Sequence, residues 1–188
     1  MKITDGKSEI EYRGGTRVVI GKFDGIHVGH QKLIRAITDK NDELRSVVFT
    51  FTYDSKLFDG KCDRILDEDA RRKKFENLGV DYLVEYELNG ETSKIEPEEF
   101  LREILVKRLH AKELVCGPDL SFGYKGKGNV ELIRGLSDEL GISVTVMDKV
   151  QYLGEDVSST RIHEALLNKD TKSVNAMLGD FADKQEVF

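Results

Sequence analysis

The feature that most constrains the fold of this chain is a regular alternation between short apolar runs and amphipathic segments. Five runs have the length and the β-branched or aromatic residues typical of buried strands. They are Arg17–Phe23, Ser46–Thr52, Val80–Tyr86, Glu113–Gly117 and Ile142–Met147. No hairpin signal joins one run to the next. Because parallel strands need long, usually helical connections, this order predicts a parallel sheet.

The segments between the runs carry apolar residues at helical spacing. The expected helices begin near Val28, pass through Ala70 to Leu78, begin at Pro97, span Asn129–Leu140, and close the chain at about Ser159–Leu167 and Lys172–Leu178. Because parallel crossovers are right-handed, we expect an α/β fold with a Rossmann-like, doubly wound, five-stranded parallel sheet and helices on both faces. This fold forms a single domain over residues 1–188. Ligands bind such sheets beyond the C-terminal ends of the strands.

Composition narrows the possible partners. The formal net charge of −6 is a poor match for nucleic acid, whose phosphates attract basic proteins. No apolar run approaches the ~20 residues that span a bilayer. The two cysteines, Cys62 and Cys116, are far apart and not spaced as metal ligands. We therefore expect a cytoplasmic protein that binds small molecules and neither nucleic acid nor membranes.

The turn after the first expected strand, Gly21–His30, concentrates the groups that bind anions. His27 and His30 lie three residues apart where a helix begins, so they share one side of it. The helix start also presents free N–H groups and a positive dipole end. Gly29 lets a ligand approach the backbone. The alternative is a glycine-rich turn with two incidental histidines, but the grouping favours a triphosphate site.

Two further features of the sequence have a functional and a plain structural interpretation. Asp24, in the same turn, could orient a histidine or a metal–nucleotide complex, or it could only form an Asp-Gly turn. Hydroxyls and a cation mark a second helix start, where they suit phosphate oxygens but could equally form an ordinary N-cap with a surface arginine. These residues are Ser158, Ser159, Thr160 and Arg161.

The motifs carry a family resemblance. Gly21–Gln31 matches the pattern GxFDGxHxGHQ throughout, and it resembles the FMN adenylyltransferase domain of bacterial FAD synthetases, in the HxGH nucleotidyltransferase superfamily. Further segments are similar in the same order along the chain. They are VVFTF at Val47–Phe51, LGVDYL at Leu78–Leu83, PEEFL at Pro97–Leu101, CGPDLSFG at Cys116–Gly123 and SSTRI at Ser158–Ile162.

The resemblance implies transfer of AMP from ATP to FMN, which yields FAD and pyrophosphate, with Mg²⁺ entering with ATP and no metal ligand from the protein. The implied catalytic residues are His27, His30 and Asp24. The implied ATP-binding residues are Gly21, Phe23, Gly29, Ser158, Ser159, Thr160, Arg161 and His163. The implied flavin-binding residues are Phe51, Tyr53, Asp119 and Phe122.

The chain departs from the family pattern at three places. The family has TFxPxP where this chain has Thr50–Leu57, so both prolines that shape the flavin pocket are absent. The serine-rich motif of the family ends in an arginine, and this chain has His163 at that position. Arg161 stands at a variable position of the motif. Leu120 replaces a phenylalanine. These departures keep two alternatives open: a nucleotidyltransferase for another small phosphorylated acceptor, such as a cytidylyltransferase, or a nucleotide- or flavin-binding protein without turnover.

Family enzymes usually carry a second domain, a C-terminal riboflavin kinase barrel. The LGDF run at Leu178–Phe181 resembles the junction between the two domains, and only a few residues follow it. We therefore expect these 188 residues to lack the barrel. Both a natural single-domain protein and a piece of a longer one are consistent with the sequence.

Overall fold

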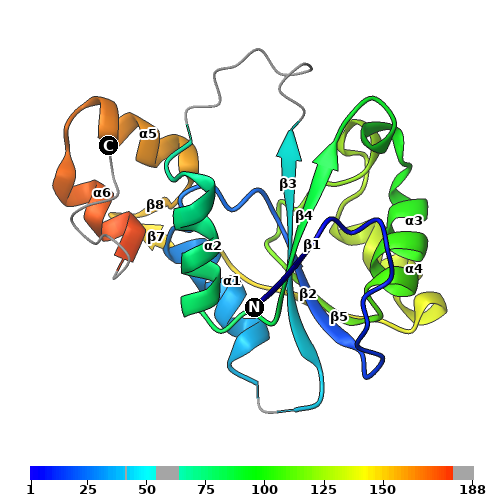
Figure 1. Cartoon of the computed structure of the whole chain (residues 1–188). Helices are drawn as coiled ribbons and strands as arrows, with labels where there is room; N and C mark the ends of the chain where they lie inside the picture. Colours follow the sequence, from blue (N-terminus) through cyan, green and yellow to red (C-terminus); the bar gives the residue numbers. More distant parts are fainter. Residues whose placement is uncertain (41, 54–63, 180–188) are drawn as a thin grey trace.

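The computed structural model describes residues 1–40, 42–53 and 64–179. Within these residues, six strands form one sheet in the order β1-β4-β3-β2-β5-β6, and every neighbouring pair is parallel (Figure 1). The strands are β1 Lys2–Thr4, β2 Thr16–Ile20, β3 Arg45–Tyr53, β4 Tyr82–Leu88, β5 Ala111–Cys116 and β6 Ser143–Val146. The expected parallel α/β fold is confirmed.

The expected number of strands was one too few. Five of the observed strands correspond to the five apolar runs, but β1 adds a sixth at the edge of the sheet, beside β4. β1 has only three residues, Lys-Ile-Thr, and its side chains are exposed or half-buried. A strand of three residues at the edge of a sheet, with side chains that are not buried, does not need apolar residues. The sequence therefore contains no apolar run that would predict it.

Side chains of the central strands alternate between two hydrophobic cores, because successive residues of a strand point to opposite faces. On β2, Val18 and Ile20 pack in one core with Phe49 and Leu101. Val19, between them, packs in the other core with residues of α1. Both faces are therefore buried, which explains why the strands read as continuous apolar runs rather than alternating ones.

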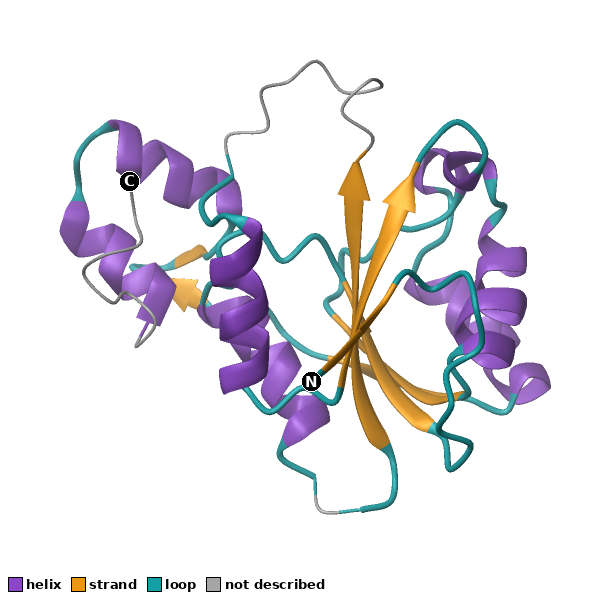
Figure 2. Ribbon diagram, viewed as in Figure 1, coloured by secondary structure: helices purple, strands orange, loops and turns teal. Residues whose placement is uncertain are grey.

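The helices cover both faces of the sheet (Figures 1 and 2). Their bounds are α1 Val28–Thr38, α2 Glu68–Asn77, α3 Pro97–Glu99, α4 Val130–Leu140, α5 Ser159–Leu167 and α6 Thr171–Leu178, with 3₁₀ turns η1 Thr92–Lys94 and η3 Tyr124–Gly126. α2 ends before Gly79 and α4 ends at Gly141, and both glycines have the positive φ that commonly follows a helix.

The helix that begins at Pro97 widens after one turn. Its continuation, η2 Phe100–Arg108, is a π-type segment, and it ends with a bond from the Leu109 N–H to the Ile104 carbonyl, five residues back. Its buried residues recur at intervals of one, three and four, namely Phe100, Leu101, Ile104, Leu105 and Leu109. All five pack in the core that contains Phe49, so the wider turn still buries one continuous face.

A smaller group of elements lies beside the sheet, on the side of α1 and α2 (Figure 1). It contains α5, α6 and an antiparallel pair that the sequence did not predict, β7 Gln151–Tyr152 and β8 Glu155–Asp156. Its helices form a third core with the segment that leads into α2, through Leu66 and Ile162 among others. Because α5 joins the rest of the molecule there, its first turn comes to face the end of the sheet.

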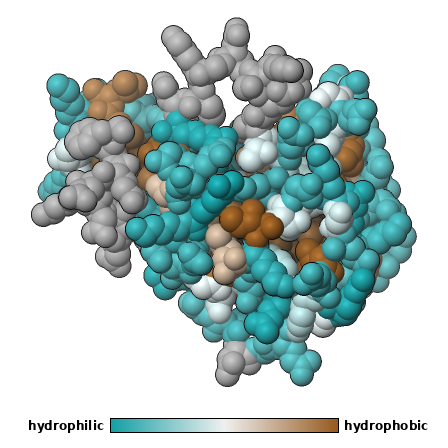
Figure 3. Space-filling model, viewed as in Figure 1, coloured by the Kyte–Doolittle hydropathy of each residue, from teal (hydrophilic) through white to brown (hydrophobic). Residues whose placement is uncertain are grey.

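The surface is mostly hydrophilic, with hydrophobic side chains in small separate areas of the face that Figure 3 shows. Large hydrophobic side chains that are exposed in the described part of the chain are Ile3, Leu153 and Leu167. None of the described helices is long and apolar enough to cross a bilayer.

Candidate active site

A cavity of about 1180 Å³ opens beyond the C-terminal ends of β2, β3, β5 and β6. The chain runs from β2 outward to β3 and β4, then crosses to β5 on the other side of β2. The cavity thus lies where the strand order reverses, which is the usual ligand site of such sheets. Its volume exceeds the ~300–1,000 Å³ of typical single-ligand pockets, so it has room for two small substrates.

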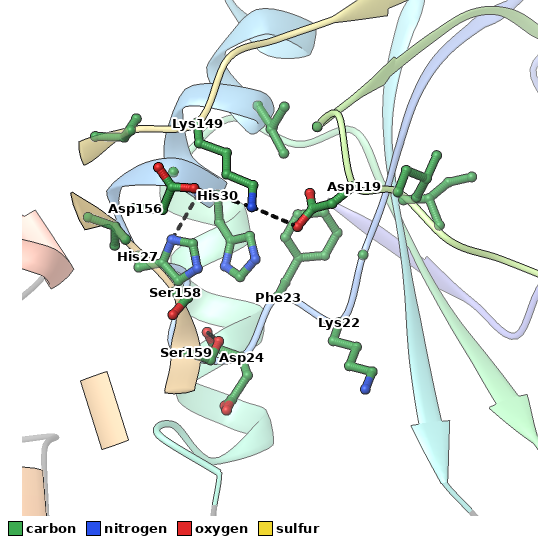
Figure 4. Close-up of a pocket in the computed structure, with 18 of the residues that line it drawn as sticks. Lys22, Phe23, Asp24, His27, His30, Asp119, Lys149, Asp156, Ser158 and Ser159 are labelled. Atoms are coloured by element: carbon green, nitrogen blue, oxygen red, sulfur yellow. Dashed lines mark hydrogen bonds and ion pairs between the residues drawn. The ribbon is translucent and has the colours of Figure 1, made fainter. Parts of the chain in front are cut away.

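His27 and His30 stand together on the wall of the cavity (Figure 4). His27 is the N-cap of α1, and its Nδ1 accepts a hydrogen bond from the His30 N–H at 3.3 Å. An accepting Nδ1 carries no proton, so the neutral ring holds its proton on Nε2. The two rings stack with centroids 3.7 Å apart and planes 18° apart. The turn therefore fixes two imidazoles side by side.

Burial keeps both imidazoles neutral. His27 is only 6% exposed, and burial lowers its pKa to about 4, although the Asp24 carboxylate acts in the opposite direction. The pKa of His30 is also well below its ordinary value because of burial, with smaller effects from His27 and Arg71. The His30 Nδ1 is buried and has no hydrogen-bond partner in the described structure. The pair therefore presents uncharged polar groups with unused hydrogen-bonding capacity.

The backbone of this turn is strained and held by burial. Phe23 and Ile26 adopt positive φ values of 51° and 45°, which bulky residues rarely do. Both side chains are completely buried, and the Phe23 ring meets the His30 ring edge-on at 5.0 Å. The Gln31 side chain also holds the Ile26 carbonyl, at 2.9 Å. Packing therefore maintains a conformation that places the histidines.

Gly29 gives room to His27 as well as to a ligand. A Cβ at this position would lie 3.2 Å from two atoms of the His27 ring, which is closer than nearly all real contacts of this kind. Gly29 also lines the cavity, as the preceding Gly21 does. A larger residue at position 29 would therefore displace the N-cap imidazole.

Asp24 links the first turn to the two other segments that enter the site. One carboxylate oxygen accepts the Ile65 N–H at 3.0 Å, just before α2. The other lies 3.3 Å from Nε2 of His163, on α5. The Asp24 carbonyl accepts the Ser159 hydroxyl at 3.2 Å. One residue thus fixes three segments around the cavity.

The start of α5 brings only part of the predicted ATP-binding set to the cavity. Ser158, Ser159 and His163 line it, and the Ser158 hydroxyl caps α5 by accepting the Arg161 N–H. Thr160 is exposed and lies outside the lining. The Arg161 guanidinium instead donates to the carbonyls of Tyr152 and Glu155 at 2.8 and 2.9 Å. Arg161 therefore secures the β7–β8 pair, and His163 is the residue that faces the cavity.

The predicted flavin-binding residues are divided in the same way. Phe51 and Asp119 line the cavity. Phe122 is 3% exposed and packs in the core against Phe100, with ring centroids 5.6 Å apart. Tyr53 ends β3, but its side chain lies outside the described residues. Leu120, at the position where the family has phenylalanine, also lines the cavity.

The cavity is also lined by four cationic side chains that the sequence analysis did not single out. They are Lys22, Arg64, Arg71 and Lys149. Lys149 lies between two carboxylates, 3.1 Å from Asp119 and 3.4 Å from Asp156 (Figure 4). Its place after β6 could have been anticipated, since ligands meet the C-terminal ends of strands. Arg71 belongs to α2, and the sequence of α2 has only the pattern of a charged helix. That pattern does not predict that Arg71 lines a cavity.

The described residues contain no group of three or more histidine, cysteine, aspartate or glutamate side chains suited to hold a metal ion. Cys116 is buried, and burial raises its thiol pKa to about 11. The chemistry that this cavity offers is therefore hydrogen bonding and charge neutralisation by imidazoles, hydroxyls, backbone N–H groups and cations.

Comparison with known proteins adds two curated relatives. The bifunctional riboflavin kinase/FMN adenylyltransferase of Haemophilus influenzae is 30% identical over 170 residues, which are 88% of this chain and 55% of that protein. The protein of the same name from Buchnera aphidicola subsp. Acyrthosiphon pisum is 29% identical over 185 residues, 95% of this chain and 59% of that protein. The chain thus spans less than two thirds of the length of these relatives.

Solved structures also resemble the chain. A Streptococcus pneumoniae structure, described as a macrolide-efflux protein, superposes with a TM-score of 0.80 at 30% identity, covering 95% of this chain and 71% of that one. Pantoate–β-alanine ligase of Francisella tularensis has a TM-score of 0.51 at 18% identity, with coverages of 94% and 85%, and shares the fold alone. The sequence profile described as FAD synthetase matches residues 9–161. This chain belongs to the FAD synthetase family.

Proposed function

We propose that this chain transfers AMP from ATP to FMN and forms FAD and pyrophosphate. The observation that carries the proposal is the pair of stacked imidazoles of His27 and His30 in a cavity that the first turn of α5 also lines. An adenylyl transfer needs a site for a triphosphate next to a site for the acceptor. The cavity has room for both, and the family membership of the chain supports this reaction.

The protein's task in this reaction is to position charged groups. The FMN phosphate is already an anion, so its oxygen attacks the α-phosphorus of ATP without a protein base, and pyrophosphate leaves on the opposite side. The Nε2–H of His27 donates to an oxygen near the α-phosphorus, and His30 supplies a second contact. Negative charge raises the pKa of a nearby imidazole, so both can also gain charge as the phosphates arrive.

The start of α5 is suited to the leaving group. The Ser158 hydroxyl accepts the Arg161 N–H and keeps its own hydrogen free to donate, while Ser159 fixes the turn by donating to the Asp24 carbonyl. The first turn of the helix contributes backbone N–H groups and its positive dipole end. We assign this turn to the β- and γ-phosphates of ATP. His163 stands beside it and takes the place of the family arginine, while Asp24 holds His163 in position.

Phe51 and Asp119 are the described residues that best suit the flavin. Phe51 offers an aromatic face at the carboxyl end of β3, and Asp119 offers a hydrogen-bond acceptor from the loop after β5. Lys149 fixes the Asp119 carboxylate at 3.1 Å. The two family prolines would fall at Tyr53 and Ser55, and the Tyr53 side chain and Ser55 lie outside the described residues.

Magnesium is proposed as a partner of ATP rather than a resident of the protein. Four aspartates line the cavity, and three of them, Asp24, Asp119 and Asp156, are each engaged with a protein partner, whereas the fourth is Asp148. These residues fit an ion that takes most of its oxygen ligands from phosphate and water, as Mg²⁺ commonly does. When bound, the ion neutralises phosphate charge.

The test is to incubate the purified chain with ATP, Mg²⁺ and FMN, and to separate the products by chromatography. Formation of FAD with equimolar pyrophosphate is the expected result. Nucleotidyl transfer only with CTP, or only to another phosphorylated acceptor, selects a different nucleotidyltransferase. Tight binding of ATP and FMN without any product selects a binding protein.

A further inference from the structure

Arg71 is a buried cation on the wall of the cavity without a carboxylate partner in the described structure. Its side chain belongs to α2, is only 5% exposed, and lines the cavity. Nη2 donates to the Thr50 hydroxyl at 3.0 Å. Nε is buried and has no hydrogen-bond partner among the described residues. Arginine stays charged in proteins, so this is a retained charge with an unused donor.

The neighbouring arginine shows what a structural arginine looks like on the same helix. Arg72 donates from Nε and Nη2 to the two carboxylate oxygens of Glu85, at 3.0 and 2.6 Å. Arg72 does not line the cavity. Burying a charge without a partner is costly, whereas a two-point carboxylate pair offsets that cost. Arg71 therefore has the features of a site that an anionic ligand completes.

The surroundings of Arg71 indicate which anion fits. The Thr50 hydroxyl that receives its hydrogen bond donates in turn to the Lys22 carbonyl at 3.0 Å, which fixes the guanidinium to the turn after β2. Thr50 directly precedes Phe51, the aromatic residue assigned to the flavin. The Arg71 charge also contributes to the lowered pKa of His30, so it acts on the histidine pair. Arg71 thus lines the same cavity as Phe51 and the histidine pair.

We propose that Arg71 binds the phosphate group of the acceptor and so selects phosphorylated flavin over riboflavin, an inference that rests on the proposed function. The acceptor phosphate must reach from the flavin to the α-phosphorus of ATP, and the guanidinium lines the cavity to which both places are assigned. Arginine binds phosphate through two parallel N–H groups, and the unpartnered Nε belongs to such a pair. Its role is to position the nucleophile and to offset its charge.

The test compares equilibrium binding of FMN and of riboflavin, followed by quenching of flavin fluorescence, in the natural chain and in Arg71→Met. Methionine keeps the length of the side chain and removes the charge. FMN affinity is expected to fall at least ~10-fold, as for loss of a charged hydrogen bond, while riboflavin affinity stays within about twofold. ATP affinity, measured by calorimetry, should change less than about threefold. Arg72→Met is the matched control and should leave the preference for FMN unchanged.

Thermal unfolding of the ligand-free variants gives an independent readout. Because Arg71 is a buried charge without a carboxylate partner in the described residues, Arg71→Met is expected to keep or raise the melting temperature. Arg71→Lys keeps a charge at the site and should retain most of the preference for FMN. A marked fall in melting temperature, or failure of Arg71→Met to fold, would assign the guanidinium to structure and overturn the inference.

Three results of the binding measurements on Arg71→Met also overturn the inference. They are an equal loss of affinity for FMN and riboflavin, a loss of affinity for ATP alone, and unchanged affinity for every ligand. The proposed function fails separately, if the natural chain makes no FAD. Normal FAD formation by the natural chain with an unchanged FMN preference in Arg71→Met overturns only the inference about Arg71.

Discussion

At the scale of single residues, the site depends on how the first turn places two neutral histidines. The Nδ1 of His27 is used to cap α1, so this ring can only donate toward the cavity through Nε2. His30 has a buried Nδ1 without a partner in the described residues and is held edge-on by Phe23. The two rings therefore differ in their hydrogen bonding, although the motif alone does not distinguish them.

His30→Ala is expected to lower turnover by at least ~100-fold with the fold intact, because removal of one preorganised group that stabilises developing charge typically has that effect. The measurement is kcat for FAD formation, with circular dichroism to check folding. His110→Asn is the control, since His110 interacts with Glu9 and Arg13 outside the cavity and adopts a positive φ that asparagine tolerates. Near-normal turnover in His30→Ala would remove the histidine pair from the catalytic site.

The lowered pKa of His27 predicts a pH dependence of stability. This histidine has a pKa of about 4 when folded and about 6.5 when exposed, so it takes up a proton only on unfolding between these values. Above pH 6.5 the titration of His27 does not lower the free energy of unfolding. As the pH falls from 6.5 toward 4, the unfolded chain takes up a proton that the folded chain does not, so the free energy of unfolding decreases. In His27→Asn the side chain can still cap α1 but does not titrate. The natural chain should therefore lose more stability than His27→Asn between pH 7 and 5, on the order of 2 kcal/mol in urea unfolding. Parallel curves for the two proteins would contradict the buried, neutral imidazole.

His163→Arg is expected to keep or raise kcat/KM for ATP. The His163 Nε2 already contacts Asp24, whereas arginine is always charged and binds phosphate through two N–H groups. Arg161 already serves the β7–β8 pair, so it does not supply this charge in the ligand-free structure. Arg161→Ala should accordingly affect melting temperature more than ATP kinetics. Loss of activity in His163→Arg would mean that the contact between His163 and Asp24 has a specific role that arginine cannot fill.

The sequence predicted the cavity-lining residues that belong to local motifs. The turn of His27 and His30 and the start of α5 were found because their residues are neighbours in the chain. Arg71 and Lys149 were not singled out, because their role depends on which segments the sheet brings together. Phe122 matches a family motif and Arg161 stands at a variable position of another, yet Phe122 packs in the core and Arg161 binds the neighbouring β7–β8 pair.

At the scale of elements, a buried ion cluster fastens the opposite end of the sheet. Arg17, on β2, donates to Glu113 of β5 at 2.6 Å and to Asp42 at 2.5 Å. Lys40 and Thr145 bind the same glutamate. The cluster thus connects α1, β2, β5 and β6 at the end of the sheet away from the cavity, and it keeps the strand ends in register where the site is built.

Arg17→Ala is expected to lower the free energy of unfolding by about 3–5 kcal/mol, because it leaves a mostly buried glutamate without its main partner. Urea unfolding measures this loss. Lys2→Ala, which breaks an exposed pair with Glu11, is the control and should change little. ATP affinity should stay unchanged at low temperature in both variants. A small effect of Arg17→Ala on stability would show that the cluster does not secure the strands.

Elements with a strong apolar pattern could be predicted, and elements with a weak one could not. The central strands β2 to β5 and the helices between them bury whole faces, and β6, at the edge, alternates Val with Ser or Thr, so their residues repeat with a clear period. β1 and the β7–β8 pair are two or three residues long and mostly exposed, so their sequences carry no such period. The wider turns of η2 depend on how its side chains meet the sheet, which a helical pattern does not distinguish.

At the scale of the whole molecule, the charge balance of the cavity differs from that of the chain. The chain carries a formal charge of −6, whereas the four cations that line the cavity, Lys22, Arg64, Arg71 and Lys149, equal its aspartates in number. A local group of cations within an acidic protein favours small anions over nucleic acid, whose binding needs an extended basic surface. This arrangement agrees with a site for two phosphorylated substrates.

The whole-molecule claim is that these 188 residues contain a complete adenylyl-transfer site. The measurement that tests it most directly follows ATP labelled in its α-phosphate, with Mg²⁺ and FMN, on the purified chain. The account predicts that the label appears in FAD and that one pyrophosphate is released for each FAD formed. With riboflavin in place of FMN, no labelled flavin should form. Label recovered only as ATP, or as AMP or ADP without labelled FAD, would contradict the account.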